Sequence, residues 1–249
     1  MPNNTITQLQ SEIDSLKQKL EKQDVFIATA VHDLRSPLTI AILAVDLLED
    51  LEKNEEAFQM LKKALERLKT MMERFLSVPK LERGNLKVEL KQLDLKKFMQ
   101  NFYEIHLPLL EKGQIKFTFE NKIADQNISI PTDELLLLQV FENLINNALR
   151  FVPDDGNGEI ILKAELSDAG KFRISFSDNG CGVPDKQKTK IFEKFASHSK
   201  KQSTGLGLYI CQNIIKTLGG RIWCEDSVGG GATFCVELPI KAPAKSHQS

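Results

Sequence analysis

The sequence has no excess of charge of either sign and no long apolar run, and each shortage excludes a class of protein. Its 33 basic and 34 acidic residues leave a net charge of −1. No overall field therefore draws the chain to nucleic acid or to lipid, and we expect recognition to be local. No apolar run approaches the roughly 18 residues that a membrane span needs, and the N-terminus lacks the regions of a signal peptide. We therefore expect neither a nucleic acid partner nor a direct membrane span.

The chain also has few cysteines, and they indicate a reducing compartment. All of them lie in the second half: Cys181, Cys211, Cys224 and Cys235. Their spacing fits neither a metal site nor a secretory disulfide framework, so we expect reduced thiols and a cytoplasmic protein. At 249 residues the chain is too long for one small domain and suits two.

The first part of the chain shows the apolar repeat of a coiled coil, which predicts a long helix over residues 3–50. Interrupted only by Gln23, apolar residues recur at steps of three and four: Ile6, Leu9, Ile13, Leu16, Leu20, Ile27, Ala30 and Leu34. His32 projects about 200° away from this stripe and so lies on the outer face of the helix. On spacing alone, His32 also fits a surface residue without a role. Pro37 favours a functional role for His32, because a proline kink inside a helix costs about 3 kcal/mol or more and such a cost suggests that the bend is used.

A second apolar series predicts a second helix that ends before Pro79: Phe58, Leu61, Leu65, Leu68, Met72 and Phe75. The polar residues 49–56 predict the turn between the two helices. Two amphipathic helices cannot close a core alone, so we expect an α-helical hairpin that forms a four-helix bundle in a homodimer. The alternative is a hairpin that packs on the second domain of its own chain.

Residues 26–38, FIATAVHDLRSPL, resemble the H-box of sensor histidine kinases, whose usual form is F-x-x-x-x-S-H-E-L-R-T-P-L. Asp33 stands for the usual Glu and Ser36 for the usual Thr. The resemblance implies that His32 is phosphorylated and that Asp33 accepts its proton. It also implies that Arg35 steadies the phosphoryl group and that Ser36 holds the position that orients water in the family's phosphatase reaction. The expected partner is the receiver domain of a response regulator.

The rest of the chain mixes helix and strand patterns, which predicts an α/β two-layer sandwich. We expect a short strand over residues 86–90, a helix capped by Asp94 that ends at Gly113, and a helix over residues 133–150 capped by Thr132. Further strands are expected at residues 115–120, 159–166, 171–178, 221–225 and 233–238, and a further helix at 205–218. The tail after Pro239 has too little apolar content to become ordered.

Several segments of the second half suit a nucleotide. Asn143 and Asn147 share one helical face, and their amide oxygens suit Mg²⁺. Asp178 precedes Gly180 and Gly182 at a strand end, where a carboxylate can accept a hydrogen bond from an amine while the glycines admit a flat ring. Each segment alone also fits an ordinary helix face or turn.

Two later segments complete the set. The apolar residues 191–195 lead into the polar residues 196–204, which have the character of a lid. The segment 204–208, TGLGL, opens the last predicted helix, where backbone N–H groups favour phosphate.

In this order the segments resemble the N, G1, F and G2 boxes of the histidine-kinase ATP domain, whose fold is shared with DNA gyrase and mismatch-repair ATPases. The resemblance implies ATP and Mg²⁺ as cofactors, with Asn147 as the metal ligand and Asn143 supporting it. It implies that Asp178 reads adenine and that Gly180 and Gly182 form the turn around the base. It places further nucleotide contacts at Arg150, Phe151, Phe195, Thr204, Gly205, Leu206, Gly207 and Thr233.

The sequence thus predicts a multidomain chain. Its expected parts are a coiled coil at residues 1–24, a dimerisation and phosphotransfer hairpin at 25–80, an ATP-binding domain at 81–240 and a disordered tail at 241–249. The resemblance implies a protein histidine kinase that autophosphorylates His32 and phosphorylates an aspartate of a response regulator. The alternatives are a catalytically weak ATP-binding scaffold of a two-component pathway and a gyrase-like ATPase. We also expect either a piece of a longer sensor or a soluble protein that receives its input from a separate sensor module.

Overall fold

A computed structural model of the chain describes residues 10, 12–14, 16–17, 27, 30–31, 34–47, 55, 57–65, 68–69, 71–72, 86–123, 128–167, 170–196 and 205–240. Contacts divide the chain into two compact units: Met1–Val78 with Ser197–Leu206, and Pro79–Ala196 with Gly207–Ser249. The expected domain boundaries remain predictions. None of the described helices is long and apolar enough to cross a membrane.

The described residues of the first unit between positions 10 and 72 are helical. Residues 34–47 and 57–65 are helical, as the apolar repeat predicts, and Pro37 is buried within the first of these segments. Besides Pro37, the buried residues of these two segments are small: Ala41, Ala44, Ala57 and Ala64. Large apolar side chains on the same two segments are about half exposed: Leu38, Ile42, Leu43, Val45, Phe58 and Leu65. These segments therefore present apolar surface that the single chain does not cover.

Several expectations for this unit lie outside the described residues. They include the placement of His32 on the outer helix face, most of the coiled coil, and nearly all of the turn over residues 49–56. Glu55 is described and is helical, so the prediction that this residue lies in the turn was wrong. Polarity alone does not distinguish a turn from the exposed first turn of a helix.

The second unit is built on a five-stranded sheet in the order β2-β4-β5-β7-β6. The strands are β2 (Lys116–Asn121), β4 (Glu159–Leu166), β5 (Phe172–Asp178), β6 (Arg221–Asp226) and β7 (Ala232–Leu238). Strand β2 pairs with β4 in parallel, and every other neighbouring pair in the sheet is antiparallel. The structure confirms the predicted hairpin of β4 with β5 and the predicted pair of strands at the end of the domain.

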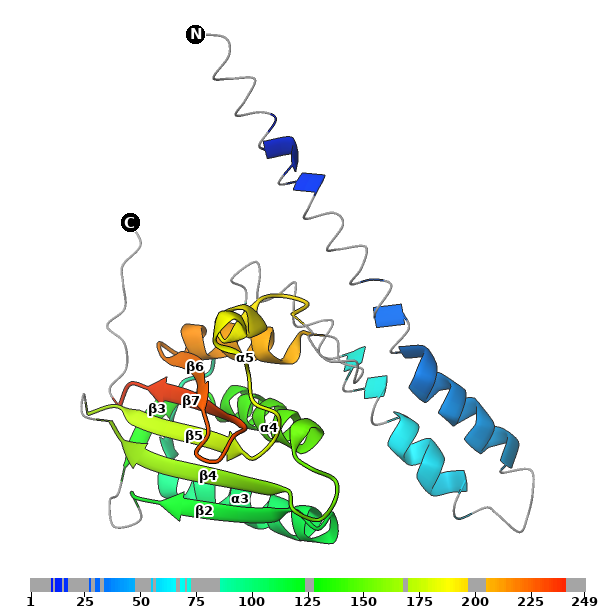
Figure 1. The fold of residues 1–249 in the computed structure, drawn as a ribbon, viewed down its shortest axis with the longest axis horizontal. Coiled ribbons are helices and arrows are strands. Elements are labelled where there is room, and N and C mark those ends of the chain that lie inside the picture. Colours follow the sequence, from blue (N-terminus) through cyan, green and yellow to red (C-terminus); the bar gives the residue numbers. More distant parts are fainter. Residues whose placement is uncertain are drawn as a thin grey trace. The chain divides into compact units, whose positions relative to one another are not determined.

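Helices α3 (Leu95–Lys112), α4 (Glu134–Phe151) and α5 (Gly207–Thr217) form the second layer. Figure 1 shows α3 and α4 on the same side of the sheet. The layers meet at Phe102 of α3, Phe141 of α4 and Phe176 of β5, whose ring centroids lie 5.2 to 6.0 Å apart. Truncating one such ring costs about 3–5 kcal/mol, so this cluster holds α4 firmly against α3 and the sheet. The expected two-layer sandwich is confirmed.

Both ends of α3 lie where the sequence predicts them, but the strand before α3 does not. The Asp94 carboxylate accepts the Lys97 N–H at 3.0 Å, and the helix ends at Gly113, both as predicted. The prediction of a strand over residues 86–90 was wrong, because the strand of this region, β1, lies at Lys91–Asp94. It pairs antiparallel with β3 (Ser129–Thr132), which was not predicted. Such pairing depends on a partner far along the chain and leaves a weak local signal.

Candidate functional site

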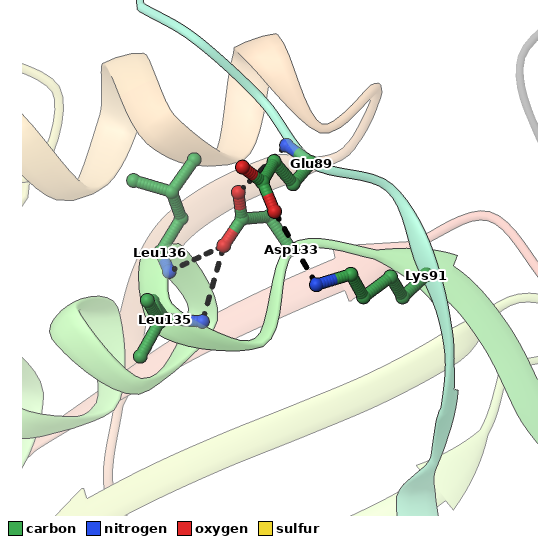
Figure 2. A network of polar contacts seen from close by, with 5 residues as sticks. All are labelled: Glu89, Lys91, Asp133, Leu135 and Leu136. Carbon is green, nitrogen blue, oxygen red and sulfur yellow. Dashed lines mark hydrogen bonds and ion pairs between the residues drawn. The ribbon is translucent and has the colours of Figure 1, made fainter.

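The first turn of α4, the helix that carries both asparagines, is fixed by Asp133. Its Oδ1 accepts the backbone N–H groups of Leu135 and Leu136 at 3.1 Å each, and its Oδ2 accepts the N–H of Glu89 at 2.9 Å (Figure 2). Thr132, the expected cap, is the last residue of β3 and carries a buried hydroxyl without a hydrogen-bond partner among the described residues. The predicted cap was therefore wrong by one residue, because Thr132 belongs to a strand.

Asn143 and Asn147 lie one turn apart on α4, with Asn143 buried and Asn147 half-buried. The Asn143 Nδ2 donates to the Gln139 carbonyl at 3.0 Å. Its Oδ1 lies 3.4 Å from the position that a Cβ on Gly207 would take, and so faces the start of α5. Amide oxygens are hard ligands of the kind that Mg²⁺ accepts, so these two side chains fit that ion.

Asp178 is the last residue of β5 and the only carboxylate of the predicted nucleotide site. Its side chain is 4% exposed, and its Oδ1 accepts the N–H of Gly180 at 2.9 Å and the N–H of Ala232 at 3.2 Å. Burial raises the pKa of the Asp178 carboxyl, and the two backbone hydrogen bonds oppose that rise. Because two backbone donors fix one of its oxygens, the carboxylate is held in one orientation as an acceptor.

The glycines around Asp178 let three stretches of backbone approach one another. A Cβ on Gly180 would lie 2.6 Å from the Phe151 carbonyl oxygen at the end of α4. Gly182 has φ +68°, and a Cβ there would lie 3.0 Å from the Gly231 carbonyl oxygen. A Cβ on Gly231 would overlap the Asp178 carbonyl. The site therefore brings the end of α4, the loop after β5 and the start of β7 together without intervening side chains.

The remaining predicted contacts are distributed as follows. Arg150 and Phe151 form the last turn of α4, and both are half-buried. Phe195 has φ +68°, which is uncommon for a residue other than glycine, and Lys194 Nζ lies 5.0 Å from its ring centroid. Thr204 lies outside the described residues.

The predicted phosphate segment is divided between the two units. Gly205 and Leu206 belong to the first unit, and Gly207 begins α5 in the second. Of these residues, Gly207 is placed against Asn143, at the N-terminus of a helix, where backbone N–H groups and the helix dipole favour an anion.

The structure places the side chain of Thr233, another predicted contact, apart from that of Asp178. Successive side chains of a strand point to opposite faces, and Ala232 is the residue of β7 that lies beside Asp178. The Thr233 hydroxyl lies 2.9 Å from the Ser177 hydroxyl, on the face of the sheet away from Asp178. The nucleotide contact expected of Thr233 stays a prediction, and this position on the sheet does not favour it. Ala232, which the sequence did not single out, is the residue of β7 whose N–H orients the Asp178 carboxylate, and only the strand register could have revealed this.

The arrangement combines three chemical functions in one unit: an oriented buried carboxylate, two amide groups on one helix face, and a helix N-terminus. A carboxylate beside glycine backbone can read an amine on a flat ring. Amide oxygens can hold a hard cation, and the helix N-terminus can hold phosphate. Among the described residues, no group of three or more His, Cys, Asp or Glu side chains could hold a metal ion instead.

In the comparison with known proteins, two family models match the chain, one in each of its parts. Residues 132–242 match the model of the histidine kinase-, DNA gyrase B-, and HSP90-like ATPase family. Residues 22–84 match the model of the His Kinase A (phospho-acceptor) domain.

Individual proteins that resemble the chain are histidine kinases or sensory kinases. The adaptive-response sensory kinase SasA of Crocosphaera subtropica is 30% identical over 94% of this chain and 64% of its own length. The nucleotide-free catalytic domain of the histidine kinase ThkA is 31% identical, with a TM-score of 0.54 over 61% of this chain and 99% of that chain. A structure of ThkA in complex with the response regulator protein TrrA is 26% identical, with a TM-score of 0.62 over 90% of this chain and 63% of that chain.

The chain spans 64% of the length of the SasA protein. A phospho-acceptor domain precedes an ATPase-type domain, and the second domain shares both sequence and fold with a histidine kinase catalytic domain. The chain therefore belongs to the histidine kinase family.

Proposed function

We propose that this chain is an ATP-dependent protein histidine kinase that autophosphorylates His32 and passes the phosphoryl group to an aspartate of a response regulator. The observation that carries the proposal is the buried Asp178 carboxylate, oriented by the N–H groups of Gly180 and Ala232 in a glycine-lined turn. This turn lies within a domain of the ATPase family, and a phospho-acceptor domain that contains His32 precedes it.

In this proposal the adenine ring lies against the backbone of the loop after β5. Asp178 accepts a hydrogen bond from the exocyclic amine, and the absence of a Cβ on Gly180 and Gly182 leaves room for the ring. Phe151 and Phe195 lie beside the nucleotide, as the family resemblance implies. The triphosphate extends toward Arg150 and the N-terminus of α5, which begins with Gly207.

We further propose that Mg²⁺ is held by Asn147 with support from Asn143. Their amide oxygens fit an ion that prefers oxygen ligands and keeps several of its waters. When bound, the ion would neutralise charge on the triphosphate during transfer. The hydrogen bond from Asn143 to Gln139 holds its amide in one orientation, which supports a fixed role for this side chain.

Phosphoryl transfer then needs mainly positioning. A neutral nitrogen of the His32 imidazole attacks the γ-phosphorus, the bond to the β,γ-bridging oxygen breaks, and ADP leaves. Asp33 takes the proton from the other imidazole nitrogen, and Arg35, which is exposed on its helix, balances charge on the phosphoryl group. An aspartate of the receiver domain next attacks the phosphorus, and the phosphorus–nitrogen bond breaks.

We also propose that the two helical segments of the first unit pair with those of a second copy to form a four-helix bundle. The large side chains of residues 34–47 and 57–65 that stand about half exposed in the single chain support this arrangement. Burying apolar surface stabilises by about 25 cal/mol per Å², so covering both segments would favour pairing. Sedimentation that gives a single chain at micromolar concentration would contradict the dimer.

A response regulator is the proposed partner because a related kinase, ThkA, is known in complex with one. We propose the cytoplasm as the location, because the four cysteines, all among the described residues, form no disulfide and the reaction draws on cellular ATP.

The test is to incubate the purified chain with γ-labelled ATP and Mg²⁺ and to examine the stability of the protein-bound label. A phosphohistidine gives label that is lost in acid and kept in alkali. A scaffold that binds ATP without transfer gives no label, and a gyrase-like ATPase releases inorganic phosphate alone.

A further inference from the structure

A second histidine, His106 of α3, lies away from the candidate site and is buried, at 8% exposure. Its ring stacks on Phe102 with a centroid separation of 4.2 Å. Its Nδ1 lies 2.9 Å from the Phe102 carbonyl oxygen, and its Nε2 lies 3.2 Å from a carboxylate oxygen of Glu142 on α4. His106 therefore joins α3 to the helix that carries Asn143 and Asn147.

The geometry of this contact selects one protonation state of the His106 ring. A neutral imidazole has one N–H and one lone pair, while both groups that face the ring, the Phe102 carbonyl and the Glu142 carboxylate, only accept hydrogen bonds. Either neutral tautomer would point a lone pair at an oxygen about 3 Å away. Only the imidazolium, with two N–H groups, donates to both.

The electrostatics of the site agree with the geometry. Burial acts against the charged ring and lowers the pKa of His106, but the hydrogen bonds to Glu142 and to the Phe102 carbonyl outweigh burial, and the pKa is raised. Glu142, on α4, is the charged group that acts on the ring. From β5, Phe176 packs behind Phe102 and brings no charge.

Glu142 links this contact to the nucleotide helix directly, because Asn143 is the next residue. Successive residues of a helix are turned by about 100°, so Glu142 faces α3 while Asn143 faces Gly207 at the start of α5. A pair that holds Glu142 therefore adds to the packing of Phe141 on Phe102 and Phe176 in setting the rotation of α4 about its own axis. That rotation sets the direction of the Asn143 and Asn147 amides.

We propose that His106 is a positioning residue of the nucleotide site, whose imidazolium holds Glu142 and thereby α4, so that nucleotide affinity falls when the ring loses its proton. The inference rests on the proposed function, since it concerns the same site. It adds a pH dependence of binding that originates outside the phosphotransfer chemistry of His32.

The experiment measures the affinity of the full chain for a non-hydrolysable ATP analogue with Mg²⁺ by calorimetry, from about pH 6 to about pH 9. The proteins are the unaltered chain, Glu142→Gln, His106→Gln and the double variant. Glu134→Gln, an exposed change on the same helix away from His106, is the matched control. Titration of the nucleotide itself is common to all proteins and cancels in their ratios.

As pH rises across this range, nucleotide affinity should fall in the unaltered chain and in Glu134→Gln. That loss should be about threefold to tenfold larger than the loss in Glu142→Gln. The double variant should match the single variants, because each removes the same interaction. The Glu142 side chain is 43% exposed, so its replacement by Gln leaves a folded protein even if His106→Gln does not.

Two results overturn the inference, and they are distinguishable. Parallel profiles for the unaltered chain and Glu142→Gln overturn the role of His106 while leaving nucleotide binding intact. Absence of binding by every protein at every pH overturns the proposed function itself, and with it this inference.

Discussion

The backbone N–H of Ala232 donates to the Asp178 carboxylate over 3.2 Å and joins the start of β7 to the end of β5 inside the candidate site. The same carboxylate oxygen accepts the Gly180 N–H. The acid is therefore oriented by backbone groups and needs no neighbouring side chain to hold it. Its chemistry should accordingly be sensitive to replacement of Asp178 and to protonation.

Replacing Asp178 with Asn should reduce ATP affinity by about tenfold to a hundredfold, because a hydrogen bond to a charged acceptor is worth about 1.5–3 kcal/mol. Calorimetric titration with a non-hydrolysable ATP analogue measures the loss. Asp155→Asn, on an exposed loop, is the control and should bind like the unaltered chain. Equal affinities for Asp178→Asn and the control would remove Asp178 from the site.

The raised pKa of Asp178 predicts a specific acid limb for nucleotide binding. The amine of the base needs the carboxylate form, so affinity should fall as pH decreases through the raised pKa of Asp178, at a higher pH than an ordinary Asp would give. Affinity measured by fluorescence between neutral and acid pH checks this. A constant affinity down to the pH at which an exposed Asp protonates would contradict it.

Gly180→Ala should abolish nucleotide binding, since the added Cβ would lie 2.6 Å from the Phe151 carbonyl and must displace the loop or the end of α4. Gly170→Asn is the matched control. Gly170 has a positive φ, unlike Gly180, but nothing lies within 4 Å of its Cβ position, and Asn tolerates this conformation. Unchanged binding by Gly180→Ala would show that the loop does not approach α4 so closely.

Asn147→Asp should remove Mg²⁺-dependent nucleotide binding, because it adds a negative charge where the triphosphate is expected. Asn146→Asp makes the same change on the adjacent, exposed residue and should bind normally. Titrations with and without Mg²⁺ distinguish the two variants. Retained Mg²⁺-dependent binding by Asn147→Asp would contradict the proposed metal ligand.

A prediction about stability concerns Glu237 on the other face of the sheet. This buried carboxylate accepts a hydrogen bond from Arg221 Nε at 2.7 Å. Burial raises its pKa, but Arg221 and Ser167 outweigh burial, and the pKa of Glu237 is lowered. Arg221→Met should therefore lower the free energy of unfolding by about 1–3 kcal/mol, less than for a fully buried pair because Arg221 is largely exposed.

The pH dependence of that effect follows from the lowered pKa. The stabilisation is present above the pKa of Glu237 in the unfolded chain, near its usual 4.5, and is lost as pH falls through the lowered value. Urea unfolding of the unaltered chain and Arg221→Met at neutral and acid pH measures it. The free energies of unfolding of the two proteins should differ near pH 7 and become equal in strong acid. An equal difference at both pH values would contradict the pairing of Arg221 with Glu237.

Sequence patterns predicted the elements whose signals are local. Asp94 and Gly113 delimit α3 because caps act within one turn, and β4 and β5 alternate because one of their faces is buried. The prediction failed at Thr132 and over residues 86–90, where pairing of β1 with β3 decides the structure. Neither strand has a buried face long enough to show in the sequence.

In the candidate site, too, the residues with a local sequence signal could be predicted and those placed by contacts between elements could not. Asp178, Gly180 and Gly182 could be found because an acid followed by glycines has a local chemical meaning. The position of Thr233, on the face of the sheet away from Asp178, follows from the strand register, which the sequence does not contain. His106 and Glu142 carry no motif, and their contact exists only because α3 and α4 cross at that point. Interactions between elements therefore account for most of what sequence reasoning missed.

The central claim is that ATP bound in the second domain phosphorylates His32, and mapping of the phosphorylated residue tests it most directly. The full chain and His32→Gln are incubated with ATP and Mg²⁺, and phosphate is located by mass spectrometry under alkaline conditions, with ATP affinity measured alongside. The account predicts phosphate on His32 in the unaltered chain, and no phosphate but unchanged ATP affinity in His32→Gln. Equal phosphorylation of both proteins, or phosphate on another residue alone, would contradict it.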